Sequence, residues 1–206
     1  MRIISGKYKG RTIKMPKGIR PTQNKVRKAL FDILGEINGL SFLELFAGSG
    51  AVGFEALSQG AKEVVFVEKD RKCIEKIEEN LSVLAFSRSR VLALDALVAI
   101  KQLGESGEKL DIIFLDPPYY KRKVPRHHAS RSSAGDSGSK VAVMGESLSK
   151  KTLQTLGAYD ILAPNGFIVV QHFKKDNLPD RLGDLVLFKQ ARYGDTILSF
   201  YKKALP

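Results

Sequence analysis

The sequence predicts an α/β fold, in which a doubly wound, mostly parallel seven-stranded sheet follows a small N-terminal hairpin and helix. From residue 39 onward, short apolar runs typical of buried strands alternate with segments of helical periodicity. The last two expected strands, 185–190 and 196–201, have no helix between them, which indicates an antiparallel edge. With 206 residues, the chain is long enough for one well-packed domain and a small appendage.

Residues 1–38 form the expected appendage. Residues 2–14 alternate weakly and contain two glycines, which suits a short hairpin. After Pro21, apolar residues follow helical spacing as far as Ile37, and Gly39 lies beyond the end of the predicted helix. The opposite face of this helix is expected to carry Lys25, Arg27 and Lys28.

Residues 39–206 form the expected main domain. Strands are expected at 41–46, 63–68, 90–94, 111–115, 166–171, 185–190 and 196–201. Helices are expected at 51–58, 71–84, 96–103 and 148–160. Residues 121–147 break the pattern because they are basic, rich in Ser and Gly, and without apolar periodicity. We expect a flexible basic insertion there.

The net charge of +12 is concentrated in two segments of the chain. Residues 1–38 contain ten Lys/Arg and two Asp/Glu, and residues 121–151 contain eight and two. A near-neutral body with basic appendages indicates a polyanionic partner, most simply nucleic acid. We therefore expect residues 1–38 to be an RNA-binding extension.

Composition also narrows the class of protein. No uninterrupted apolar stretch is long enough to span a bilayer, and the N-terminus lacks the apolar core of a signal peptide. The single cysteine, Cys73, cannot form an internal disulfide and lies in an apolar helical stripe, so packing is expected rather than reactivity. His127 and His128 have no cysteine partner, and no metal site is expected. We expect a cytoplasmic monomer that does not bind membranes.

The most informative short stretch is Asp116-Pro117-Pro118-Tyr119, which follows the apolar run 111–115. Two consecutive prolines end the strand because neither has a backbone N–H to donate. A carboxylate, exposed carbonyls and an aromatic ring are then held at the carboxyl end of a strand, where open parallel sheets bind ligands. Asp116 and the Pro117 carbonyl can accept hydrogen bonds from an amino group while Tyr119 holds a flat ring. The alternative is a simple turn that ends the strand.

A glycine-rich turn lies between the first expected strand and the helix after it. Gly48, Gly50 and Gly53 satisfy the pattern G-x-G-x-x-G, and Glu68 ends the next strand. Glycines at these positions permit a tight turn and close approach of a ligand, and an acid at the second strand binds ribose hydroxyls. This pattern fits both dinucleotide sites and S-adenosylmethionine sites.

Two features favour S-adenosylmethionine. Glu44 lies near the turn, where a carboxylate suits the ammonium group of a methionine moiety and disfavours a pyrophosphate. The second feature is the Asp116 segment, which is expected across the cleft. Asp95, after the third strand, can also accept a hydrogen bond from an adenine amino group. Alternatively, or in addition, it caps the helix that begins at Ala96.

With these residues, the chain resembles the class I S-adenosylmethionine-dependent methyltransferases, which have a Rossmann-like sheet. More narrowly, it resembles the RsmD-type 16S ribosomal RNA guanine-N2 methyltransferases. The motifs that carry the narrow resemblance include Arg2-Ile3-Ile4-Ser5-Gly6, Arg20-Pro21-Thr22, Phe46-Ala47-Gly48-Ser49-Gly50, Glu68-Lys69-Asp70, Asp116-Pro117-Pro118-Tyr119 and Tyr193-Gly194-Asp195-Thr196. The resemblance covers nearly the whole chain except 121–147, where family members usually continue directly into a helix.

The resemblance implies transfer of a methyl group from S-adenosylmethionine to the exocyclic N2 amine of a guanine in ribosomal RNA, either free or in the small ribosomal subunit. It implies that the base is held by Asp116, Pro117, Pro118 and Tyr119. Cofactor binding is expected from Glu44, Phe46, Gly48, Ser49, Gly50, Glu68, Asp95 and Ala96. Contacts to the RNA are expected from Arg11, Arg20, Thr22 and Arg27.

Three alternatives remain open from the sequence. An enzyme of this class could methylate DNA adenine or another RNA amine, since the Asp116 segment suits amino groups generally. A catalytically silent RNA-binding or ribosome-assembly protein could have the same fold. A nicotinamide oxidoreductase fits the glycine turn but leaves Glu44 and Asp116 unexplained.

Overall fold

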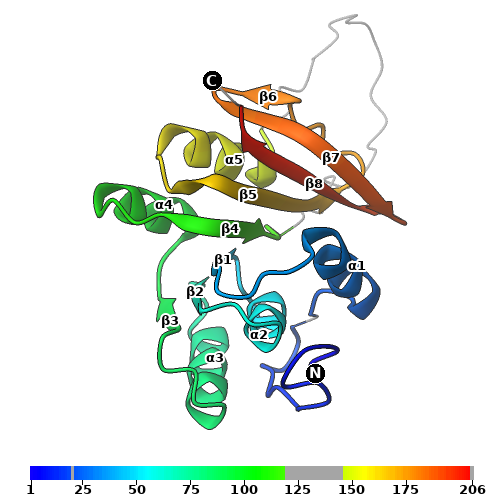
Figure 1. Cartoon of the computed structure of the whole chain (residues 1–206), viewed down its shortest axis with the longest axis vertical. Helices are drawn as coiled ribbons and strands as arrows, with labels where there is room; N and C mark the ends of the chain where they lie inside the picture. Colours follow the sequence, from blue (N-terminus) through cyan, green and yellow to red (C-terminus); the bar gives the residue numbers. More distant parts are fainter. Residues whose placement is uncertain (20, 119–145, 205–206) are drawn as a thin grey trace, which may run out of the picture.

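The described residues form an eight-stranded sheet with helices on both faces (Figure 1). The computed structural model describes residues 1–19, 21–118 and 146–204. In chain order the elements are α1 (Asn24–Leu34), β1 (Ser41–Leu45), α2 (Ala51–Ser58), β2 (Glu63–Val67), α3 (Arg71–Val83), β3 (Arg90–Leu92), α4 (Ala96–Glu105), β4 (Leu110–Leu115), α5 (Leu148–Ala158), β5 (Leu162–Phe173), β6 (Arg181–Leu182), β7 (Leu185–Tyr193) and β8 (Thr196–Lys203).

The sheet has the strand order β3-β2-β1-β4-β5-β8-β7-β6. Strands β1 to β5 pair in parallel, and β8, β7 and β6 follow in antiparallel pairs. The doubly wound sheet and its antiparallel edge are therefore confirmed, with one strand more than the seven expected. The additional strand, β6, pairs over only two residues. It is too short to produce a periodic pattern in the sequence.

Helix α1 ends earlier than its apolar spacing predicted. The sequence pattern continues to Ile37, whereas the helix ends at Leu34. Gly35 adopts a φ of 70° with a ψ of −139°, a conformation open to glycine at low cost, and the helix ends there. Ile37 is nevertheless buried, in the loop after the helix.

Alternation along the strands divides the apolar side chains between two cores. Val64 and Phe66 of β2 face the core that contains α1, α2 and α3. Val65 and Val67 face the opposite core, which contains α4 and α5. The same separation of helices is visible in Figure 1. Strands buried on both faces explain why the sequence shows continuous apolar runs there rather than alternation.

The order of the chain through the sheet reverses between β1 and β4. To one side of β1 lie β2 and β3, and to the other lie β4 and β5. The parallel register pairs Leu45 with Leu115, so the chain leaves the sheet at Phe46 and Asp116 from adjacent positions. Open α/β sheets bind ligands outside the carboxyl ends of their strands at such a reversal.

The N-terminal segment 1–14 packs against the end of α2. An antiparallel bridge between Arg2 and Thr12, with backbone hydrogen bonds from Ile3 to Arg11 and from Ile13 to Met1, forms the expected short hairpin. Contact with α2 is close at Gly6, where a Cβ atom would lie 2.0 Å from the carbonyl oxygen of Ser58. A side chain at Gly6 is therefore incompatible with this packing.

A buried ion pair joins the N-terminal segment, α1 and α2. Nε of Arg27 lies 3.3 Å from Oε2 of Glu55, and both side chains are 0% exposed. The Arg27 guanidinium also donates to the carbonyl of Arg2 at 2.9 Å. The carboxylate of Glu55 accepts from the backbone N–H of Ile4 and Ser5 at 3.0 and 2.8 Å. The expectation that Arg27 lies on an exposed basic face and contacts RNA is therefore wrong, because its charge is enclosed by these partners.

We predict that Arg27→Met destabilises the fold by about 3–5 kcal/mol, because it leaves the buried Glu55 carboxylate without its cation. Chemical denaturation monitored by circular dichroism measures this loss. Lys28→Met is the matched control, since the ion pair of Lys28 with Asp32 is exposed and such pairs contribute about 0–1 kcal/mol. Equal losses in the two variants would contradict the assigned role of the buried pair.

Candidate active site

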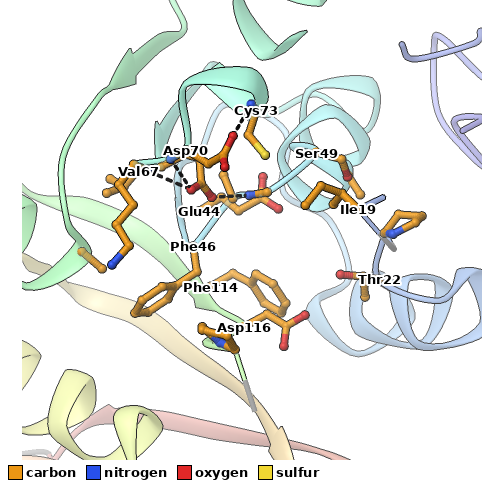
Figure 2. Close-up of a pocket in the computed structure, with 18 of the residues that line it drawn as sticks. Ile19, Thr22, Glu44, Phe46, Ser49, Val67, Asp70, Cys73, Phe114 and Asp116 are labelled. Atoms are coloured by element: carbon orange, nitrogen blue, oxygen red, sulfur yellow. Dashed lines mark hydrogen bonds between the residues drawn. The ribbon is translucent and has the colours of Figure 1, made fainter. Parts of the chain in front are cut away.

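A cavity of about 460 Å³ lies at the carboxyl ends of the parallel strands. Glu44 and Phe46 line it from β1, and Phe114 and Asp116 line it from β4 (Figure 2). A further wall, from the segment before α1, is formed by Gly18, Ile19, Pro21 and Thr22. Small-molecule sites typically occupy about 300–1,000 Å³. The cavity is therefore large enough for a cofactor and lies where the strand order predicts.

The turn between β1 and α2 is left-handed at three positions. Phe46, Gly48 and Gly50 have φ angles of 59°, 54° and 71°. Phe46 has a bulky side chain, for which this conformation is strained, and such residues cluster at functional sites. Gly53 serves packing instead, because a Cβ atom there would lie 2.3 Å from the Phe66 ring. The three glycines of the motif thus have different physical roles.

Glu44 both contacts helix α2 and lines the cavity. Its side chain is buried, and its carboxylate accepts hydrogen bonds from the N–H groups of Val52 and Gly53 at 3.2 and 2.8 Å. It therefore binds the first turn of α2 while also lining the cavity. Burial raises the pKa of this carboxyl to about 8, against the two backbone hydrogen bonds, and the nearby Asp116 carboxylate adds to the rise.

Glu68 connects β2 to the glycine turn. Its Oε2 accepts from the Gly48 N–H at 2.7 Å. Its Oε1 accepts from the N–H groups of Lys69 and Asp70 at 2.8 and 2.9 Å. A carboxylate has about four acceptor positions. One or more of these positions remains for a ligand hydroxyl.

Asp95 lies across the cavity at the start of α4. Its Oδ1 accepts from the N–H of Leu97 at 3.1 Å, so the helix-capping interpretation is confirmed. Its Oδ2 lies 3.1 Å from Nζ of Lys69. Burial opposes ionisation of Asp95, but the hydrogen bonds from Lys69 and Leu97 outweigh it and lower the pKa of this carboxyl. Ala96 follows as the first residue of the helix and also lines the cavity.

Asp116 is held by a donor from the neighbouring strand. The Gln171 amide on β5 donates from Nε2 to Oδ2 of Asp116 at 2.7 Å. Burial raises the pKa of Asp116 to about 7, and the Gln171 hydrogen bond and the nearby Thr22 side chain oppose the rise. Figure 2 shows Thr22 and Asp116 facing one another across the cavity wall.

The remaining predicted site residues have several different placements. Pro117 is buried, and Pro118 is exposed at the cavity. Ser49 is buried within the glycine turn and lines the cavity. Arg11 is exposed on the N-terminal segment and is not among the residues that line the cavity. Tyr119 and Arg20 lie outside the described residues, as does nearly all of 121–147.

The described lining of the cavity is acidic, although the chain as a whole is basic. It contains five carboxylate side chains and one lysine: Glu44, Glu68, Asp70, Asp95, Asp116 and Lys69. Carboxylates in a cavity attract a cationic ligand and repel a pyrophosphate. The acidic lining therefore fits a ligand with sulfonium and ammonium groups better than it fits a dinucleotide.

Cys73 also lines this cavity, but it is not a reactive thiol. Its side chain is 1% exposed. Burial raises the pKa of Cys73 to about 11, and the neighbouring carboxylates of Glu68 and Asp70 raise it further. The thiol therefore stays protonated at neutral pH and contributes packing, as its place in the apolar stripe predicted.

Sequence reasoning missed two kinds of residue at this site. Ile19 is 39% exposed and lines the cavity from the N-terminal extension, within contact distance of the glycine turn. An isolated apolar residue among basic ones was the available signal. Gln171 gave no signal, because its contact with Asp116 depends on the pairing of β4 with β5.

The described residues include no group of three or more His, Cys, Asp or Glu side chains that could hold a metal ion. Among the described helices, none has the length and apolar character needed to cross a membrane.

The sheet order and the placement of this cavity define the α/β fold of the class I methyltransferases. A solved structure of yhhF from Escherichia coli, described as a candidate methyltransferase, shares this fold. It has a TM-score of 0.76 and 27% identity, and the similarity covers 99% of this chain and 98% of that one.

The family model described as conserved hypothetical protein 95 matches residues 1–131. YlbH of Bacillus subtilis, described as a candidate rRNA methyltransferase, is 35% identical over 98% of this chain and 99% of its own length. The ribosomal RNA small subunit methyltransferase D of Haemophilus influenzae is 37% identical over 58% of this chain and 64% of its own length. The chain belongs to this family, that of the RsmD-type methyltransferases.

The two raised carboxyl pKa values predict a pH-dependent contribution to stability. Folded Glu44 and Asp116 hold their protons more tightly than the unfolded chain does. Their contribution is therefore full below about pH 4, the ordinary carboxyl range, and is lost as the pH rises through about 7 and 8. Glu44→Gln removes the part that comes from Glu44.

The free energy of unfolding of the wild type, minus that of Glu44→Gln, should therefore decrease between about pH 5 and about pH 8. Denaturation curves at a series of pH values measure this difference. Glu75→Gln, at an exposed position on α3, is the matched control and should give a constant difference over the same range. A constant difference for Glu44→Gln as well would contradict the raised pKa.

Proposed function

We propose that this protein transfers a methyl group from S-adenosylmethionine to the exocyclic N2 amine of a guanine in small-subunit ribosomal RNA. The observation that carries the proposal is a single cavity lined both by the glycine turn and by Asp116. Membership of the RsmD-type family and the rRNA methyltransferase names of its relatives support the choice of substrate.

The residues present fit S-adenosylmethionine. The acidic lining suits its positive charges, and Glu44 and Glu68 come from the strands where a methionine ammonium and a ribose are expected. Asp95, although it caps α4, keeps acceptor capacity for an adenine amino group. When bound, the cofactor supplies a methyl group that is already activated by the sulfonium. The protein must then mainly align the acceptor nitrogen with that methyl carbon.

Asp116 is assigned to the acceptor amine. The guanine amino lone pair is delocalised into the ring, so the nitrogen is a weak nucleophile. Hydrogen bonds from the amine to Asp116 and to the Pro117 carbonyl favour the pyramidal nitrogen as positive charge develops on it. Once the amine has accepted the methyl group that the bound cofactor would supply, its nitrogen must lose one proton. A carboxylate with a pKa of about 7 is suited to receive it near neutral pH.

The basic N-terminal extension is assigned to the RNA backbone. Exposed cations on residues 1–38 include Arg11, Lys25 and Lys28, and α1 leads directly from Thr22 at the cavity wall. We assign Arg20 to contact with a phosphate of the RNA. We assign Tyr119 to stacking against the target base. The target base must leave its own stack to reach Asp116.

We predict that Asp116→Ala lowers the rate of methyl transfer by about 100-fold or more, because the variant lacks the acceptor for the amine hydrogens. Transfer of a labelled methyl group to ribosomal RNA measures the rate, and calorimetry measures cofactor affinity, which should change little. Near-normal turnover in the variant would rule out the assigned role.

We also predict that the double variant Lys25→Glu, Lys28→Glu binds RNA more weakly. The slope of the logarithm of RNA affinity against the logarithm of salt concentration should become shallower by about one unit for each phosphate that the variant no longer neutralises. Cofactor affinity should not change. Lys101→Glu, on α4 at the opposite face of the sheet, is a control with a similarly exposed i,i+4 ion pair. An equal loss of RNA affinity in the control would contradict a binding role for α1.

The choice of substrate is tested by comparing methylation of 16S RNA, assembled small subunits and duplex DNA. Methylation of the ribosomal substrates alone supports the proposal. Preferential methylation of DNA would favour an adenine methyltransferase. No cofactor binding by calorimetry would favour a catalytically silent RNA-binding protein.

A further inference from the structure

Gln171 lies beside the candidate catalytic carboxylate with half of its side-chain amide unpaired. The residue is 6% exposed, on the strand next to β4. Its Nε2 donates to Oδ2 of Asp116 at 2.7 Å. Its Oε1 is buried, and within the described part of the chain nothing donates a hydrogen bond to it.

Packing does not explain a glutamine at this position. A buried polar group without a partner destabilises the fold, and an apolar side chain would avoid that cost. Val169 and Val170, which precede it on β5, are apolar and 0% exposed. His172, which follows it, is polar and buried, but its ring is paired with Ser199. The favourable contact of the amide is its bond to Asp116. The reason for a glutamine therefore lies in what that bond does to the carboxylate.

We propose that Gln171 is a positioning residue, which fixes the carboxylate of Asp116 in the orientation that accepts hydrogen bonds from the substrate amine. The inference rests on the proposed function. An ionised carboxylate can only accept hydrogen bonds, so the amide must turn its nitrogen toward Asp116. The Gln171 amide holds the carboxylate from β5, and the Thr22 side chain lies near it from the segment before α1. The remaining acceptor positions of the carboxylate are left for the amine.

The same hydrogen bond also favours the ionised form of Asp116. Burial raises the pKa of Asp116, and the Gln171 hydrogen bond and the nearby Thr22 side chain oppose that rise. Among the described charged groups, the buried Glu44 on β1 couples unfavourably with Asp116, and Arg27 on α1 interacts with Glu44. Loss of the Gln171 donor should therefore raise the pKa of Asp116 further and shift the acidic limb of the activity profile to higher pH.

Gln171→Leu tests the inference, because it keeps the bulk of the side chain and removes both amide groups. Rates of methyl transfer to ribosomal RNA are measured across about pH 6 to 9. The acidic limb should move up by about one pH unit, which lowers the rate on that limb about tenfold. The free energy of unfolding should stay the same or rise, because the unpaired oxygen is also removed. Gln190→Leu, whose amide donates to Ser199 at 2.9 Å, is the matched control and should leave the pH profile unchanged.

A folded Gln171→Leu variant with an unchanged pH profile would overturn the inference. A uniform loss of rate, with lost stability and no shift of the profile, would also overturn it and indicate a structural role. If the wild type binds cofactor but methylates no ribosomal RNA, the proposed function fails instead. Nuclear magnetic resonance titration of the Asp116 carboxyl then decides the role of Gln171. A higher pKa in the variant supports the inference, and an unchanged pKa overturns it.

Discussion

The site depends on the pairing of β1 with β4. These two parallel strands are adjacent although two strands and three helices separate them in sequence, and Leu45 pairs with Leu115. That register brings the glycine turn after β1 and the proline-terminated end of β4 to neighbouring positions. A shift by one residue would exchange the two faces of β4 and turn Asp116 away from the cavity. Buried apolar side chains on both faces prevent such a shift.

The protein has an acidic cavity and a basic extension, so it can bind two partners of opposite charge. The cavity carries an excess of carboxylates, whereas the N-terminal extension carries an excess of cations. In the proposed function, a cationic cofactor and a polyanionic RNA would be attracted to separate surfaces. These surfaces adjoin at Gly18, Ile19, Pro21 and Thr22, which belong to the basic extension and line the acidic cavity. The buried pair of Arg27 and Glu55 connects this extension to α2.

The fold was predictable because its evidence is local. Apolar runs, helical periodicity and the break at Gly39 gave the strands and helices of the main domain to within a few residues. The cavity-lining positions of Glu44, Glu68 and Asp95 followed from their places at or just beyond the carboxyl ends of β-strands. The prediction for Arg27 was wrong because the local sequence does not distinguish an exposed arginine from a buried one. An arginine among lysines looks the same whether it faces solvent or pairs with a buried carboxylate 28 residues away. Gln171 was missed for a related reason, since its contact with Asp116 exists only after two distant strands pair.

In the proposed reaction, one cavity brings an activated methyl group to a guanine amine of ribosomal RNA. The most direct measurement is mass-spectrometric mapping of 16S ribosomal RNA after incubation of small subunits with the protein and isotopically labelled S-adenosylmethionine. We expect the label in a methyl group on the N2 amine of a guanine. Label on another atom or another base, or no label despite cofactor binding, would contradict the account.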